Sequence, residues 1–372
     1  MGERGADDTI GLVMRRAIVM IALVAGCGDN LAPSASATRQ VLSLSGNETA
    51  TCLIDVDGQL VCWSRLHMGP AEPGELGDPV TGLPARFGDE RWRDISVGAM
   101  HACGIRDDGT LWCWGKNCAG QLGDGTRASR FEPIQVGTEA RWQSVATGGG
   151  HSCAIDDEGA LSCWGGLDHG QSDCAAIPMQ TPTRVDGTWL QVSSGWYSTF
   201  AVRDDGTLWR WGDRELTDPT PFELPSQVGS SRWRTIATGL FGAYGVRDDG
   251  TLAFADAGDG VETQIGPDAD WDVAIAARDH GCAIKQEGTL WCWGRNDMGQ
   301  LGTGTSSEDL AEPIRVGIAP GWTSVTSGWA HSCGLLDGSV HCWGMNHEGE
   351  LGIGMPYDNE IHRPRPIAIE AD

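Results

Sequence analysis

A phrase of similar residues returns about every fifty positions along this chain. In one copy, Trp92 opens a first apolar segment, His101 and Cys103 begin a second, and residues 111–115 (Leu-Trp-Cys-Trp-Gly) form a third. Further copies start at Trp142, Trp189, Trp233, Trp271 and Trp322. A repeat of this length is one supersecondary unit copied around an axis or along a line. The repeat therefore constrains the architecture more strongly than it constrains the function.

The spacing inside the phrase sets the number of copies. The residue eleven positions after the opening Trp is Cys in four copies and aromatic in two: Cys103, Cys153, Cys282, Cys333, Phe200 and Tyr244. Counting back eleven from Cys52 reaches Val41, which opens a seventh copy without Trp. Six residues after the opening position stands Gly98, or Asn47 in the first copy. Because Gly and Asn tolerate a left-handed backbone, we expect that conformation there.

Each copy contains a hairpin whose loop fixes the register. The three-residue loop 107–109 (Asp-Asp-Gly) suits a type I turn closed by Gly, and folding it places Cys103 opposite Cys113. The last copy is one residue shorter, and its loop Asp337-Gly338 is a preferred two-residue sequence that restores the same alignment. The predicted pairs are Cys52 with Cys62, Cys103 with Cys113, Cys153 with Cys163, Cys282 with Cys292, and Cys333 with Cys342.

We interpret these pairs as disulfides, because the copies with Phe200 and Tyr244 also lack the second Cys. Directly opposed residues in an antiparallel pair lie close enough for such a bond. Cys118 and Cys174 occupy equivalent loops and are candidates for a sixth pair. This cysteine usage indicates an oxidising compartment.

The alternative for the cysteines is zinc, since His-x-Cys recurs at four positions: His101, His151, His280 and His331. Structural zinc needs four ligands that converge on one point, whereas two cysteines already face each other within each hairpin. We therefore expect no metal and no cofactor. The repeated His is interpreted as a hydrogen-bonding residue between repeats.

Residues 1–26 have the pattern of an export signal. Arg15 and Arg16 precede an apolar segment, residues 17–25, that is too short to span a bilayer. It ends at Cys27 in a sequence that resembles the box of bacterial lipoprotein signals, whose Cys is lipidated; Met14 suits such a signal better as the start. Residues 27–40 then form a flexible tether, and residues 41–372 the folded domain. The alternative is an ordinary secretory signal with an incidental Cys.

The net charge of −25 limits the partners. A strongly acidic surface disfavours nucleic acid and anionic membranes and favours solubility and cationic partners. Asp-x-Asp-Gly at residues 55–58 is interpreted as a turn rather than a calcium loop, which needs six to eight oxygen ligands. We expect a monomer in the bacterial cell envelope that touches the membrane only through its lipid, with the outer membrane or cell surface favoured over the inner membrane.

Three phrases resemble repeats of the regulator of chromosome condensation family: residues 148–155, 108–115 and 120–126. The third returns at residues 296–302 and 346–352, and the resemblance covers Val41 to Ile369. The resemblance implies an all-β, seven-bladed β-propeller. The strand at residues 366–369 matches those that precede the Trp segment in other copies, and no such strand precedes Val41. We therefore expect the C-terminal strand to complete the first blade and close the ring.

The resemblance leaves the function open, because the family includes an exchange factor, a light receptor and many binding scaffolds. We favour a non-catalytic binding scaffold whose partner is a protein or a glycan. Its predicted ligand face consists of residues near the repeat glycine: Trp196, Tyr197, Phe241, Arg278, Asp279 and Trp329. The alternative is an extracytoplasmic hydrolase or lyase acting on glycans, which would need acid–base groups that meet in one pocket.

Overall fold

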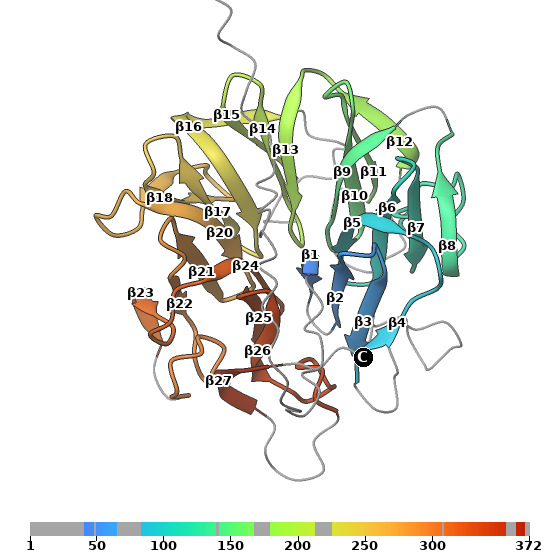
Figure 1. The fold of residues 1–372 in the computed structure, drawn as a ribbon. Helices are drawn as coiled ribbons and strands as arrows, with labels where there is room; N and C mark the ends of the chain where they lie inside the picture. Colours follow the sequence, from blue (N-terminus) through green and yellow to red (C-terminus); the bar gives the residue numbers. More distant parts are fainter. Residues whose placement is uncertain are drawn as a thin grey trace, which may run out of the picture. The chain divides into compact units, whose positions relative to one another are not determined.

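The computed structural model describes residues 41–47, 50–64, 83–138, 141–166, 179–212, 225–306, 309–354 and 362–368. They belong to one compact unit, Thr38–Asp372. The described residues contain strands and no helix, in agreement with the all-β prediction (Figure 1). In this part of the chain, nothing helical reaches the length and apolar character that crossing a bilayer requires. The predicted signal, the tether and Cys27 lie outside the described residues.

The strands form five four-stranded sheets and one seven-stranded sheet, with antiparallel pairing throughout. The first sheet consists of β1 (Val41–Gly46), β2 (Ala50–Asp55), β3 (Leu60–Ser64) and β4 (Ala85–Arg86). The second consists of β5 (Trp92–Val97), β6 (His101–Arg106), β7 (Leu111–Gly115) and β8 (Arg130–Val136). The third consists of β9 (Trp142–Thr147), β10 (His151–Asp156), β11 (Leu161–Gly165) and β12 (Met179–Val185).

The remaining strands follow in chain order. The seven-stranded sheet consists of β13 (Trp189–Ser194), β14 (Thr199–Arg203), β15 (Thr207–Trp211), β16 (Ser226–Thr238), β17 (Gly242–Arg247), β18 (Leu252–Asp256) and β19 (Glu262–Gln264). Next come β20 (Trp271–Ala276), β21 (His280–Lys285), β22 (Leu290–Gly294) and β23 (Leu310–Arg315). The last sheet consists of β24 (Trp322–Ser327), β25 (His331–Leu336), β26 (Ser339–Met345) and β27 (His362–Ala368).

The seven-stranded sheet joins the two repeats that lack cysteines. Its long strand β16 pairs with β15 at its beginning and with β17 at its end. The outer strand of the fifth repeat, β19, has only three residues. These two repeats are therefore linked through one continuous strand, while the described part of every other repeat forms its own four-stranded sheet.

The hairpin register matches the prediction in both loop types. Cys103 pairs with Cys113, and Gly109 closes the loop with a φ of 85°. In the shorter last repeat, Asp337 and Gly338 both have positive φ, and Cys333 pairs with Cys342. Disulfides with both cysteines among the described residues are Cys52–Cys62, Cys103–Cys113, Cys153–Cys163, Cys282–Cys292 and Cys333–Cys342. Cys118 is also disulfide-bonded, and its predicted partner Cys174 lies outside the described residues.

The predicted place of the C-terminal strand is wrong. Strand β27 pairs with β26 and is the fourth strand of the last sheet, while β4 is the fourth strand of the first sheet. The reason is visible in the second repeat, where β8 pairs with β7, the strand before it, rather than with the Trp strand β9 that follows it. The strand before each Trp segment therefore belongs to the preceding repeat.

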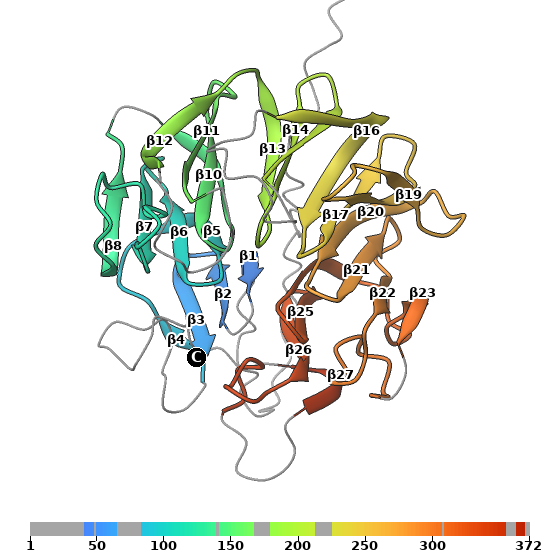
Figure 2. The same ribbon diagram turned by 180° about the vertical axis from the view of Figure 1, so that it is seen from behind.

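The first strands of the seven repeats lie next to one another in chain order. Contacts join β1 to β5, β5 to β9, β9 to β13, β13 to β16, β16 to β20 and β20 to β24, and β24 also contacts β1 (Figures 1 and 2). The buried cores lie between neighbouring sheets. For example, Trp63 of the first sheet packs with Leu335 and Leu351 of the last repeat. Each sheet thus buries apolar side chains on both faces.

Candidate ligand-binding cavity

One cavity is formed where the first strands of the seven repeats end. Its wall consists of seven short segments, one from each repeat: residues 46–47, 97–99, 147–149, 194–196, 238–240, 276–278 and 327–329. The cavity has a volume of about 100 Å³. A space of this size suits a small group, such as a single side chain.

The repeat glycine is required by close packing between repeats, and the predicted left-handed backbone is wrong. Gly98, Gly148, Gly195, Gly239 and Gly328 are absent from the described residues with positive φ. A Cβ at Gly98 would instead lie 2.6 Å from the carbonyl oxygen of Gly148 in the next repeat. Side chains are accommodated at Ala277 and at Asn47, whose amide donates to the carbonyl of Gly98. The first strands can therefore approach one another closely at the cavity.

Three of the six predicted ligand residues line this cavity: Trp196, Arg278 and Trp329. The guanidinium carbon of Arg278 lies 4.4 Å from the ring centroid of Trp329, which is 40% exposed. These residues come from different repeats and are separated by up to 133 positions in the chain. In the sequence, these side chains share only their position in the repeat. The fold brings them together at one cavity.

The other three predicted residues lie outside the cavity wall. Tyr197 contacts Trp196, with 5.9 Å between the ring centroids. Phe241 follows the lining residue Leu240 and is 40% exposed. The carboxylate of Asp279 forms ion pairs with Arg278 at 3.5 Å and with Arg295 at 3.4 Å. Asp279 therefore pairs with Arg278 without lining the cavity itself.

Ser194 and Asn47 also line the cavity and were not predicted to do so. The Ser194 hydroxyl is buried and has no hydrogen-bond partner in the described part of the chain. Both residues lie at the end of the first strand of their repeat, close to the repeat position of Trp196. That shared position is the signal from which they could have been predicted. Asn47 was predicted only as the counterpart of the repeat glycine, and Ser194 matches no known motif.

The repeated histidines bridge neighbouring repeats, as predicted. Each Nε2 lies within hydrogen-bonding distance of a hydroxyl in another repeat: His101 to Ser152 at 2.8 Å, His151 to Thr199 at 2.8 Å, His280 to Ser332 at 2.8 Å, and His331 of the last repeat to Thr51 of the first at 3.0 Å. Burial lowers the pKa of His101 and His280 to about 3, and that of His151 and His331 to about 4. These side chains are neutral at pH 7.

Among the described residues, no group suits a metal ion, and the cavity wall has no carboxyl groups for acid–base chemistry. The described residues contain no cluster of three or more His, Cys, Asp or Glu able to hold a metal ion. The wall of the cavity carries neither Asp nor Glu in the described part of the chain. Glycan hydrolysis generally needs a pair of carboxyl groups at the scissile bond, so this cavity does not favour the hydrolase alternative.

Two family models, both described as the regulator of chromosome condensation (RCC1) repeat, match the sequence. One covers residues 108–155 and 287–335, and the other covers residues 92–121, 142–171 and 322–350. The matched segments contain the strands that begin at Trp92, Trp142 and Trp322 and three of the four bridging histidines, His101, His151 and His331. No curated protein is matched by the sequence as a whole.

Several solved structures share the fold. Prp20p from Saccharomyces cerevisiae, described with its binding to Gsp1p and histones, is 18% identical with a TM-score of 0.71 over 85% of this chain and 87% of its own. Yeast RCC1 (Prp20) bound to Kap60 is 17% identical with a TM-score of 0.70, covering 94% and 91%. Human WBSCR16 is 20% identical with a TM-score of 0.65, covering 78% and 85%. The chain therefore contains RCC1 repeats, at residues 92–171 and 287–350, and its fold is similar to that of these proteins.

Proposed function

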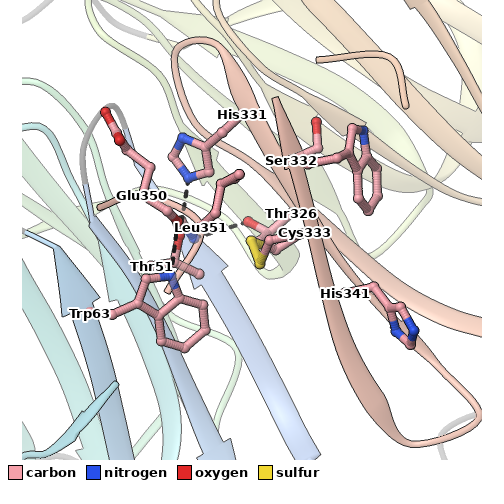
Figure 3. The surroundings of a disulfide bond; sticks show 12 residues. Thr51, Trp63, Thr326, His331, Ser332, Cys333, His341, Glu350 and Leu351 are labelled. Carbon is pink, nitrogen blue, oxygen red and sulfur yellow. Dashed lines mark hydrogen bonds between the residues drawn. A yellow bond between two sulfur atoms is a disulfide. The ribbon is translucent and has the colours of Figure 1, made fainter. Parts of the chain in front are cut away.

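We propose that the chain is a seven-bladed β-propeller that acts as a non-catalytic binding scaffold. The seven contacting first strands and the seven segments around one cavity support the blade count. Contacts between the last and first repeats support a closed ring: besides the pair His331–Thr51, Trp63 Nε1 donates to the carbonyl of Glu350 at 2.8 Å (Figure 3). In this proposal, side-chain contacts between the first and last blades close the ring, and the two blades share no strand.

The observation that carries the binding role is the meeting of Trp196, Arg278 and Trp329 at one cavity. Exposed aromatic and arginine side chains dominate many protein interfaces. Loops on a rigid scaffold can vary in sequence without cost to the fold. The yeast relative binds protein partners, and we propose that this chain also binds a protein at the mouth of its cavity. The protein itself is proposed to be a monomer.

We further propose that the scaffold is displayed in the bacterial cell envelope. The signal-like residues 1–26 and the lipoprotein-like sequence before Cys27 support export and a lipid anchor. The five disulfides support an oxidising compartment. Mass spectrometry of the mature protein tests the anchor: a lipid-modified N-terminus at Cys27 is expected, and an unmodified N-terminus elsewhere would contradict it.

Site-specific photo-crosslinking in intact cells tests the binding face. A benzophenone amino acid is placed at Leu240, which lines the cavity, or at Leu190, a 49% exposed residue near the opposite end of β13. We expect a discrete crosslinked protein only from position 240, and its loss when Trp196 and Trp329 are replaced by Ala. Equal crosslinking from both positions, or crosslinks unaffected by these substitutions, would rule out the cavity mouth as the binding face.

A further inference from the structure

We propose that the cavity binds a carboxylate carried on an apolar or aromatic group, as in the C-terminal residue of a polypeptide. This inference rests on the proposed binding function and names the chemistry that the cavity would recognise. It follows from the charge of the wall, the way Arg278 is held, the apolar surfaces beside it and the access to the cavity.

The charge of the wall differs sharply from that of the whole protein. The chain carries a net charge of −25, yet Arg278 is the single ionisable side chain among the described residues of the wall. Long-range repulsion acts on any anion near so acidic a protein, and it is screened within about 10 Å at moderate salt. Because Asp279, the carboxylate that pairs with Arg278, is not part of the wall, the cation is the charge that a ligand in the cavity meets at short range, and it favours an anion.

Arg278 is held in place by groups that leave part of it available. Its guanidinium stacks on Trp329, and its Nε lies 3.5 Å from Oδ2 of Asp279. The same carboxylate oxygen lies 3.4 Å from Arg295, which also pairs with Asp297. Within the described residues, the ion pair of Arg278 with Asp279 uses Nε, which leaves the terminal nitrogens Nη1 and Nη2 for a ligand. A planar guanidinium binds a carboxylate with two parallel hydrogen bonds.

A carboxylate fits this site better than a phosphate. A phosphate monoester carries a charge of about −1.5 to −2 at pH 7, whereas the wall offers one cation. The single charge of a carboxylate is matched by Arg278 alone. The buried hydroxyl of Ser194, which has no partner in the described part of the chain, provides a further polar group on the same wall.

The remaining surfaces suit an apolar group attached to that carboxylate. Trp196, Trp329 and Leu240 line the cavity together with glycine and alanine residues. All seven repeats contribute to the wall, so the cavity is bordered on every side by protein. A flat protein surface cannot enter such a space, whereas the end of a chain can. A C-terminal residue supplies both the carboxylate and, when it is Phe or Leu, the apolar side chain.

Fluorescence anisotropy with the exported protein tests this inference. The probe is a fluorescein-labelled peptide Gly-Gly-Gly-Phe with a free carboxylate, and it is compared with the same peptide as a C-terminal amide. We expect the amide to bind about tenfold or more weakly, because it loses the charge-assisted hydrogen bonds. Arg278→Gln should weaken binding of the free acid to the same degree, whereas the matched variant Arg184→Gln, at an exposed residue of β12, should not.

The comparison of acid with amide uses the unmodified protein and so does not depend on any variant folding. Equal binding of the two peptides, or binding of neither, would overturn the carboxylate assignment. Stronger competition by phenyl phosphate than by phenylpropionate would also overturn it. In each of these cases crosslinking from Leu240 can still identify a protein partner. The proposed binding function is therefore tested independently of the carboxylate assignment.

Discussion

Nε2 of His331 lies 3.0 Å from the hydroxyl of Thr51, although 280 positions separate the two residues in the chain. Both side chains are fully buried. The pair repeats, between the last and first sheets, the bond that His151 makes to Thr199 between consecutive sheets. The two ends of the described domain are therefore joined in the same way as its neighbouring repeats.

Replacing Thr51 by Val tests this closing contact. The change keeps the side-chain shape but leaves Nε2 of the buried His331 without a partner, which costs about 1–3 kcal/mol of unfolding free energy. Thr199→Val is the matched control, because it removes the equivalent hydroxyl between consecutive repeats. Urea unfolding should give similar losses for both variants. A loss from Thr199→Val with none from Thr51→Val would show that the terminal repeats are not joined through this pair.

The four bridging histidines predict a loss of stability in mild acid. Their folded-state pKa values of about 3 to 4 lie below the ordinary value of 6.5 because the side chains are buried. Below pH 6.5 the unfolded chain therefore binds more protons than the folded protein. Stability should fall from pH 6.5 toward pH 4, by about 1.4 kcal/mol per pH unit for each histidine.

Urea unfolding of the wild type and His101→Gln between pH 4 and 7 measures this effect. The variant should be less stable than the wild type at pH 7. Its unfolding free energy should change less steeply with pH, by about 1.4 kcal/mol per pH unit, because one titrating histidine is missing. An unchanged slope would mean that His101 is already protonated in the folded protein, and the buried neutral pair with Ser152 would be incorrect.

These histidines also show how far the sequence could predict the structure. The partner of each His occupies one fixed repeat position, directly after the His position of the neighbouring repeat. A repeat has His only where its neighbour has Ser or Thr at that partner position. In the other three cases the neighbour has Ala102, Ala243 or Gly281 there, and the His position is occupied by Ala50, Ser198 or Gly242, respectively. The correlation includes His331 with Thr51, so it also links the last repeat to the first. Strand register and cysteine pairing were likewise predictable, because a hairpin loop determines them locally.

Contacts between repeats were harder to predict, because they depend on how the sheets pack. The glycine series was assigned to backbone conformation, whereas the carbonyl of the next repeat is what excludes a side chain at Gly98. Strand β27 was assigned to the wrong sheet because sequence similarity identifies a type of strand but not its neighbour. The stacking of Arg278 on Trp329 joins two repeats through residues that match no motif.

Glu350 predicts a second, opposite pH dependence. It is fully buried at the position that Gln121 and Gln300 occupy in other repeats, and all three side chains accept a backbone N–H in their own loop. Burial raises the pKa of Glu350 from 4.5 to about 7. The protonated form therefore suits the folded state, and the stability it contributes below pH 4.5 is lost as the pH rises through 7.

Glu350→Gln should remove this penalty while keeping the acceptor. We expect the variant to be more stable than the wild type at pH 8, by up to about 3 kcal/mol, and to differ little at pH 4.5. Urea unfolding at the two pH values measures the difference. Glu312→Gln, which changes an exposed carboxylate of β23, is the control. A gain at pH 8 that persists at pH 4.5 would point to a cause other than the buried charge.

Gly328→Ala tests whether close packing at the cavity explains the repeat glycine. The new Cβ would overlap the carbonyl oxygen of Asn47 and the ring of His331, which belong to the first and last repeats. The overlap should destabilise the protein by about 1–3 kcal/mol or more, because the first strands would have to move apart. Ala277→Gly is the matched control: position 277 already accommodates a methyl group, so its removal should have a much smaller effect in urea unfolding. If Gly328→Ala were tolerated as well as Ala277→Gly, the first strands of the terminal repeats would not be in close contact, and the cavity would not be enclosed on that side.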